Sequence, residues 1–325
     1  MIDGTILITG GSGFLGVSVA TRILAKNPAQ RIVLADLVKH SRMDPIADKV
    51  RFAKADISDP KVCDELLTQE IGTIYHFAAL VSAGAERDFV AGLNANVYAT
   101  LNLLESCRKQ GRCPRFIFTS SIATFGGVGL PDVVDDWTYQ HPQNSYGVAK
   151  VVGEQLLNDY SRKGFIDGRG VRLPAIVVRD EPNPAASEYA SALVREPVAG
   201  RDYVCPVAPS TRMPILSLRQ AVEVLVLLGE LPEGSLGDYR TINGVAIAPS
   251  AEEIADAVRH CAAPNLGTID FDPDPEIARI VAGWPKEMRF DRAKALGLRP
   301  DVSIEAIIDD YLRERGKIPE ERQRR

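Results

Sequence analysis

The chain has 325 residues, of which 45% are hydrophobic and 25% charged, and its formal net charge at pH 7 is -5. This size suffices for one large core or two smaller ones, and the negative charge leaves no basic stripe for a nucleic-acid partner. No stretch reaches the ~18 apolar residues of a membrane span, and no signal peptide precedes the first strand, so we expect a two-lobed cytoplasmic protein.

The first predicted elements are a strand, a glycine-rich loop and a helix. Residues 5–8 form an apolar run typical of a buried strand, and an amphipathic run extends to about Lys26. The loop between them, TGGSGFLG at residues 9–16, fits both the G-x-G-x-x-G and the G-x-x-G-x-x-G spacing. Side chains at these glycines would block the tight turn, the approach of a pyrophosphate to backbone N–H groups, or helix packing. The pattern predicts a dinucleotide whose phosphates lie at the helix N-terminus.

A second predicted strand, residues 31–35, ends in Asp36, twenty residues after Gly16. A carboxylate at this distance can accept hydrogen bonds from both hydroxyls of an adenine ribose, and it repels the additional phosphate of NADP. The sequence therefore predicts NAD as the cofactor.

Strands and helices continue to alternate through the first half of the chain. This alternation predicts an α/β fold with a doubly wound, parallel Rossmann sheet. Ligands gather at the carboxyl ends of the strands in such sheets, which is where the polar motifs fall. The further elements expected here are strands at 50–56, around Tyr75, at 115–119 and at 171–178, and helices from 58, at 94–109 and at 146–162.

The composition changes after Arg179, where proline-rich segments interrupt the pattern. We expect residues 1–178 to form the NAD-binding Rossmann domain, with the helical run 215–230 returning to it. Residues 179–325 are predicted to be mainly a smaller α/β substrate-binding lobe. The elements expected in that lobe are a strand at 239–243 and helices at 250–261 and 303–313.

Tyr146 and Lys150 are one helical turn apart, so they share a face of the predicted helix. The ammonium group can lower the pKa of the phenol by favouring the phenolate, and Ser121 can hold the oxygen that loses its proton. This set indicates a base that removes the hydroxyl proton during the oxidation of an alcohol.

The cysteines and histidines indicate no metal chemistry. The five cysteines are scattered without a C-x-x-C pair, which favours reduced, buried thiols over a disulfide framework or a zinc site. His76 lies in an apolar run, and we expect a hydrogen-bonded strand histidine rather than a ligand. No metal site is predicted.

Six motifs together resemble the extended short-chain dehydrogenase/reductases, a family of the NAD-dependent epimerase/dehydratase type. The motifs lie at residues 9–16, 56–57, 76–79, 96–100, 120–126 and 146–150. The resemblance implies that Tyr146 is the acid/base, that Lys150 tunes it, that Ser121 orients the substrate hydroxyl and that Asn96 supports a proton relay. It implies a cofactor site of Gly10, Gly13, Phe14, Leu15, Gly16, Asp36, Asp56, Ile57, Ala78, Ala79, Asn96, Thr119, Tyr146, Lys150, Pro174 and Ile176.

Within that family the chain looks similar to the D-erythronate dehydrogenases, through residues 159–165, 172–174, 182–187, 195–200 and 283–285. This implies NAD-dependent oxidation at C2 of a sugar acid or a related polyol, giving a 2-oxo acid. Arg179 and Arg212 are the candidates for binding its carboxylate bidentately. We expect the acids Asp180 and Glu181 beside Arg179 to point into solvent; the alternative is that the substrate is not a simple sugar acid. The substrate-binding residues implied are Ser82, Ser121, Thr124, Tyr146, Arg179, Asn183 and Arg212.

Two other functions remain open. A nucleotide-sugar epimerase or dehydratase would use the same three residues with a tightly bound NAD. A non-catalytic regulator would bind the dinucleotide without turnover, although it has no need of Ser121, Tyr146 and Lys150. The family's habit of pairing through two long helices, here 94–109 and 146–162, implies a homodimer.

Overall fold

The computed structural model describes residues 4–67, 70–182 and 185–316. The chain divides into two compact units. Unit 1 comprises the residues up to 124 together with 140–172 and 222–243, and unit 2 comprises 125–139, 173–221 and the residues from 244 onward.

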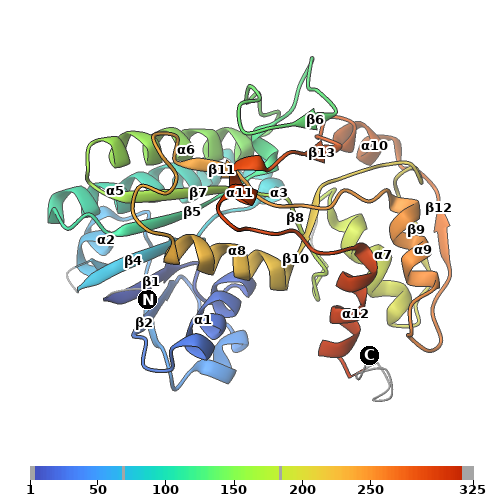
Figure 1. The fold of residues 1–325 in the computed structure, drawn as a ribbon, viewed down its shortest axis with the longest axis horizontal. Coiled ribbons are helices and arrows are strands. Elements are labelled where there is room, and N and C mark those ends of the chain that lie inside the picture. Colours follow the sequence, from blue (N-terminus) through green and yellow to red (C-terminus); the bar gives the residue numbers. More distant parts are fainter. Residues whose placement is uncertain (1–3, 68–69, 183–184, 317–325) are drawn as a thin grey trace. The chain divides into compact units, whose positions relative to one another are not determined.

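Unit 1 is built on a seven-stranded sheet within the described ranges (Figure 1). The strand order is β11-β7-β5-β4-β1-β2-β3, and the pairs β1–β2, β1–β4, β2–β3, β4–β5 and β7–β11 are parallel. The order reverses between β1 and β4, so this is the switch point at which a doubly wound sheet binds its ligand. The predicted α/β fold is thereby confirmed. The strands are β1 (Thr5–Thr9), β2 (Ile32–Asp36), β3 (Arg51–Lys54), β4 (Ile71–His76), β5 (Arg115–Ser121), β7 (Asp167–Leu173) and β11 (Thr241–Asn243).

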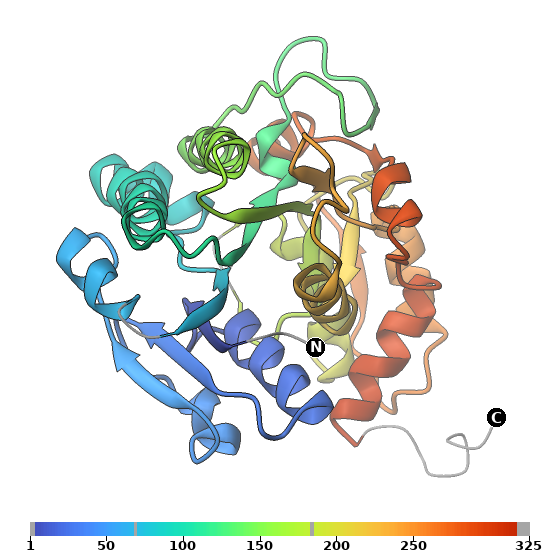
Figure 2. The same ribbon diagram turned by 60° about the vertical axis from the view of Figure 1, so that its left-hand side comes forward.

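Helices cover both faces of this sheet. In Figure 1, α5 and α6 lie on one side and α1 on the other, and Figure 2 views α5 and α6 nearly end-on. The side chains of Leu7, Ile74 and Phe116 form the core beneath α2 and α5. The helices of unit 1 are α1 (Phe14–Lys26), η1 (Ser41–Ile46), α2 (Pro60–Leu66), α3 (Ser82–Arg87), α4 (Phe89–Leu93), η2 (Asn94–Tyr98), α5 (Ala99–Gln110), η3 (Ile122–Thr124) and α6 (Ser145–Arg162).

Local sequence sets the ends of these helices. Asn144 begins α6 because its side chain accepts a hydrogen bond from the Gly147 amide at 2.8 Å. Asp59 begins α2 in the same way, through the Lys61 amide. Gly111 ends α5 with φ of 65°, a left-handed conformation that favours glycine.

Unit 2 consists of short two-stranded sheets and a helical core. The helices α7, α9 and α12 share a cluster of buried side chains that includes Leu193, Ile254 and Ile308. The helix α8 (Leu218–Glu230) begins in this unit and ends in unit 1. The other elements are β6 (Val133–Val134), β8 (Ala175–Val177), β9 (Tyr203–Cys205), β10 (Ile215–Ser217), β12 (Ile269–Phe271), β13 (Glu287–Met288), α7 (Glu188–Val198), α9 (Ala251–Arg259), α10 (Pro275–Val281), α11 (Asp291–Ala295) and α12 (Ile304–Glu314).

The expected strand at 171–178 is in fact two strands. Strand β7 stays in the large sheet and ends at Leu173, whereas β8 starts at Ala175 and pairs with β10. Pro174 separates them because it has no N–H to donate to a neighbouring strand.

Residues 239–243 were expected in the second lobe, and that prediction is wrong. Strand β11 pairs with β7 at the edge of the unit 1 sheet, and the segment that belongs to unit 1 is 222–243 rather than 215–230. An alternating apolar pattern identifies a strand but does not name its partner, so the sequence could not place this edge strand.

The helix expected at 94–109 has a different start. Residues Asn94–Tyr98 form a π-helix that follows α4 directly, and regular α-helix begins at Ala99. A π-helix adds a residue to the turn and often marks a functional site. Here it carries Asn96.

Candidate active site

The glycine loop lies at the carboxyl end of β1. It packs against β2 and against the segment that follows β4. Gly10 has φ of 65°, and a Cβ atom there would lie 2.7 Å from the Ala78 nitrogen. A Cβ on Gly11 would lie 2.8 Å from the Leu34 Cα, and one on Gly16 would lie 2.6 Å from the Gly10 carbonyl oxygen. The tight turn and its close contacts therefore require glycine at these three positions.

Gly13 differs from Gly10, Gly11 and Gly16 because its Cβ position has only one neighbour within 4 Å, the Gly10 oxygen at 3.2 Å. It begins α1 without a side-chain hydrogen bond, and the first turn, which contains Phe14 and Leu15, has no acidic residue. The positive end of α1 therefore has no acidic side chain in its first turn, and little crowds the Gly13 Cβ position. This arrangement fits a dinucleotide pyrophosphate.

Asp36 ends β2, and its side chain is hydrogen-bonded to the glycine loop. Its Oδ2 accepts hydrogen bonds from the Ser12 amide at 3.0 Å and from Ser12 Oγ at 2.8 Å, and its Oδ1 accepts one from the Leu37 amide. Three donors fix an acceptor at the place where an adenine ribose is expected.

The remaining expected cofactor residues of unit 1 follow neighbouring strands. Asp56 is exposed and accepts from the amide and hydroxyl of Ser58, while Ile57 is buried. Ala78 and Ala79 are half-buried after β4. Thr119 is buried within β5 and donates to the His76 carbonyl at 3.2 Å.

Asn96 is buried in the π-helix, where its side chain holds the segment after β4. Its Oδ1 accepts from the Leu80 amide at 2.8 Å, and its Nδ2 donates to the Leu80 carbonyl at 2.9 Å. Ser82, an expected substrate residue, is the first residue of α3.

Ser121 ends β5 and leads into the turn η3. Its Oγ accepts from the Ala123 amide at 3.1 Å, so the hydroxyl proton is left for another acceptor. Thr124 is fully buried and donates to the Ser121 carbonyl at 2.9 Å. These bonds make Ser121 a fixed hydrogen-bond donor at the end of the strand.

Tyr146 and Lys150 lie one turn apart on α6, as the spacing predicts. The Lys150 Nζ atom is 5.3 Å from the centre of the Tyr146 ring and 4.9 Å from the centre of the Phe118 ring. Gly147 allows α6 to meet the turn after Ser121, because a Cβ there would lie 2.1 Å from the Ala123 carbonyl oxygen. Tyr146 on α6 and Ser121 at the end of β5 therefore belong to elements in direct contact.

Burial controls the charge of Lys150. The side chain is 4% exposed; burial lowers the pKa of its ammonium group from 10.5 to about 8, and the Glu154 carboxylate opposes this shift. Lys150 is thus a cation at neutral pH, close to the point of losing its charge.

A buried ion pair on the next turn of α6 was not identified from the sequence. The Glu154 carboxylate accepts from Arg172 at 2.8 Å, from Gln140 at 3.0 Å and from the Ser120 hydroxyl. Arg172 also donates to Asn243 and to the Tyr239 hydroxyl, and Glu154 and Arg172 have no exposed surface. The four-residue spacing that links Tyr146 to Lys150 continues to Glu154, which was the available signal.

The other expected site residues belong to unit 2. Pro174 and Ile176 are buried there. The Arg179 Nε donates to the Ile176 carbonyl at 3.3 Å, whereas Arg212 donates to the Ala248 carbonyl and to Glu253, both at 2.7 Å. Asn183 lies outside the described residues.

Asp180 is largely exposed, as expected, and it is also paired. Its carboxylate forms an ion pair with Arg315, just after α12. The guanidinium of Arg315 lies 3.6 Å from the centre of the Tyr311 ring. The charge of Asp180 is therefore balanced by Arg315, so Asp180 is not an unpaired carboxylate beside Arg179.

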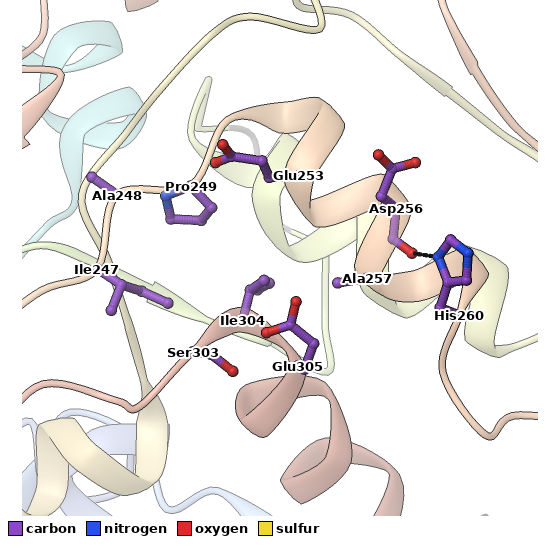
Figure 3. Close-up of a pocket in the computed structure, with 10 residues that line it drawn as sticks. All are labelled: Ile247, Ala248, Pro249, Glu253, Asp256, Ala257, His260, Ser303, Ile304 and Glu305. Atoms are coloured by element: carbon purple, nitrogen blue, oxygen red, sulfur yellow. Dashed lines mark hydrogen bonds between the residues drawn. The ribbon is translucent and has the colours of Figure 1, made fainter.

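A hollow of about 540 Å³ lies in unit 2, between α9 and the start of α12 (Figure 3). Glu253, Asp256 and Glu305 line it together with His260, whose Nδ1 donates to the Asp256 carbonyl at 2.7 Å. Three carboxylates disfavour an anionic ligand. None of the expected substrate or cofactor residues lines this hollow.

The described part of the chain contains no group of three side chains placed to hold a metal ion. All five cysteines are free. Among the helices in the described ranges, none is long and apolar enough to cross a membrane.

Comparison with known proteins gives consistent matches along almost the whole chain. A model described as the NAD dependent epimerase/dehydratase family matches residues 6–240. The chain is 41% identical to D-erythronate dehydrogenase of Cupriavidus necator, over 96% of this chain and 98% of that protein, and 39% identical to the Haemophilus influenzae protein of the same name, over 94% and 98%. A solved structure, a nucleoside-diphosphate-sugar epimerase from Agrobacterium tumefaciens, is 33% identical with a TM-score of 0.89, covering 97% of this chain and 95% of that one.

We predict that Gly147→Ala lowers kcat by about 100-fold, because moving α6 by even ~1 Å misplaces Tyr146 relative to Ser121. Overpacking should also cost ~1–3 kcal/mol of unfolding free energy. Val302→Ala, at an exposed position outside α6, is the control and should leave kcat unchanged. Steady-state kinetics with purified proteins decide, and a Gly147→Ala enzyme with normal kcat would show that this contact does not position the site.

We further predict that Lys150 titrates near pH 8 rather than 10.5. Because the unfolded chain keeps this proton up to about pH 10, folding stability should rise with pH between about 8 and 10.5 as the folded protein releases it first. NMR titration of labelled lysine side chains measures the midpoint, with Lys150→Arg identifying the resonance. A midpoint at the ordinary lysine value would contradict the effect of burial.

Proposed function

The chain belongs to the NAD-dependent epimerase/dehydratase family, and from that premise we propose that it oxidises the C2 hydroxyl of a sugar acid such as D-erythronate to a 2-oxo acid. The comparisons confirm the predicted family, the NAD cofactor and the NAD-dependent dehydrogenase class. The substrate proposal is carried by the two D-erythronate dehydrogenases, which are 41% and 39% identical over nearly their whole lengths.

In the proposed reaction Tyr146, as phenolate, takes the proton from the C2 hydroxyl. The Ser121 hydroxyl, fixed by the turn after β5, donates to the same substrate oxygen. The buried charge of Lys150, 5.3 Å from the Tyr146 ring centre, favours the phenolate. General acid–base catalysis of this kind contributes roughly 10²- to 10⁴-fold.

Bound NAD supplies the acceptor for the hydride that leaves C2. The substrate thus loses a proton from oxygen and a hydride from carbon, so the C2 alcohol becomes a carbonyl. The glycine loop and Asp36 are the proposed ligands of the pyrophosphate and ribose. Asp36 should exclude the additional phosphate of NADP by charge repulsion.

Arg179 and Arg212 remain our proposed ligands for the substrate carboxylate. A guanidinium binds a carboxylate through two parallel hydrogen bonds. Arg212 already donates to Glu253 and the Ala248 carbonyl, so it would exchange an internal carboxylate for that of the substrate.

We extend the proposal to a cytoplasmic homodimer that pairs through the two long helical segments, residues 94–109 and 146–162. Three apolar side chains on these segments are exposed, which is typical of a protein contact. They are Tyr98, Val148 and Val152. All five cysteines are free, which suits a reducing compartment.

Purified protein incubated with D-erythronate and NAD should form NADH in proportion to the 2-oxo acid produced, and should form far less with NADP. A panel of four- to six-carbon aldonates and a nucleoside-diphosphate sugar sets the specificity. Tyr146→Phe should lower kcat by roughly 10²- to 10⁴-fold. Tyr139→Phe, at an exposed tyrosine, is the matched control.

Isomerised nucleotide sugar without net NADH would favour the epimerase instead. NAD binding without turnover of any substrate would favour the non-catalytic regulator. A Tyr146→Phe enzyme with nearly normal kcat would contradict the assigned acid/base.

A further inference from the structure

A continuous chain of buried hydrogen bonds crosses the switch point of the unit 1 sheet. Thr9 and His76 are the last residues of β1 and β4, and they are register partners. Thr9 Oγ1 lies 2.7 Å from His76 Nδ1, and His76 Nε2 lies 2.9 Å from Thr100 Oγ1 on α5. All three side chains are at most 2% exposed.

The two ends of this chain are backbone groups of opposite kinds. At one end the Ala78 amide donates to Thr9 Oγ1 at 3.4 Å. At the other end Thr100 Oγ1 donates to the Asn96 carbonyl at 2.8 Å. The first group can only donate and the last can only accept.

These fixed ends determine every proton between them. The single proton of Thr100 goes to the Asn96 carbonyl, so His76 Nε2 must donate to Thr100. His76 Nδ1 then accepts in a neutral ring, and Thr9 gives it its own proton while accepting from Ala78. One orientation and one tautomer of His76, with the proton on Nε2, satisfy the whole chain.

The surroundings of the ring keep it neutral. Burial and the charge of Lys150 lower the pKa of His76 from 6.5 to about 3. The ring lies between Phe116 and Phe118 of β5, with centroid distances of 5.8 and 6.1 Å. His76 is therefore the hydrogen-bonded strand histidine expected from the sequence, with a defined direction of donation.

The chain holds the segment after β4 at both ends. Ala78 is fixed through Thr9, and it is the residue whose nitrogen leaves no room for a Cβ on Gly10. Leu80 is fixed by both polar atoms of the Asn96 side chain. The same residues thus attach segment 78–80 to the glycine loop and to the π-helix.

We propose that His76 is a positioning residue for NAD: through Thr9 and Thr100 it holds segment 78–80 against the glycine loop in the arrangement that binds the dinucleotide. The proposal rests on NAD as the cofactor and is independent of the substrate. Its test can therefore succeed or fail whether or not D-erythronate is oxidised.

The experiment replaces each hydroxyl and measures the Kd for NAD by isothermal titration calorimetry. Thr9→Val and Thr100→Val keep the side-chain shape but remove a hydrogen bond, and each should raise the Kd by about tenfold. Thr9→Ser and Thr100→Ser keep the hydroxyl and should bind NAD nearly as the parent does. Because both valines act through one ring, the double variant should be weakened by less than the product of the single effects.

Thr73→Val provides the matched control on β4. Thr73 is also fully buried, but its Oγ1 has no hydrogen-bond partner among the described residues. This variant should leave the Kd for NAD unchanged. If Thr9→Val and Thr100→Val also bind NAD normally and lose only thermal stability, the chain is merely structural and the proposal fails.

NMR of the histidine nitrogens tests the proposal without relying on a folded variant. The chain contains only four histidines, and the His76 signals can be assigned by correlating the ring nitrogens with the backbone of residue 76. We expect a protonated Nε2 and an unprotonated Nδ1 between about pH 5 and 8. The opposite tautomer, or an imidazolium in this range, would overturn the proposed direction of the chain.

Discussion

The close approach of two backbone segments at the β1–β4 switch point is the constraint on which the rest of unit 1 depends. Gly10 lies so near the Ala78 nitrogen that a Cβ atom would be 2.7 Å away. The glycine loop can therefore turn directly into α1, whose N-terminus is the end of a helix that favours a phosphate, and β4 can pass directly into segment 78–80. Gly10 after β1 and Ala78 after β4, two of the expected cofactor residues, are thereby held together.

Charge balance among buried residues of α6 and β7 links the fold to the proposed chemistry. Lys150, Glu154 and Arg172 are all buried, and the three together carry one net positive charge when ionised. Glu154 is committed to Arg172 and two further donors, so it moderates Lys150 without neutralising it. In the proposed mechanism a phenolate at Tyr146 would balance the remaining charge.

The sequence predicted those parts of the fold that local patterns determine. The glycine loop, Asp36 after β2, and the shared face of Tyr146 and Lys150 depend on fixed spacings within one or two elements. The edge position of β11, the division at Pro174 and the Glu154–Arg172 pair depend on which distant segments meet, and alternation or helical spacing does not encode partners. The direction of donation through His76 likewise required the positions of four separate groups.

In the proposed reaction, which Tyr146, Ser121 and Lys150 promote, C2 of a hydroxy acid loses a hydride to NAD. D-erythronate carrying deuterium at C2 tests this most directly, with mass spectrometry of both products. We predict one deuterium in the reduced cofactor for each 2-oxo acid formed, and none left at C2. Unlabelled NADH, or deuterium retained on the sugar acid product, would contradict the account.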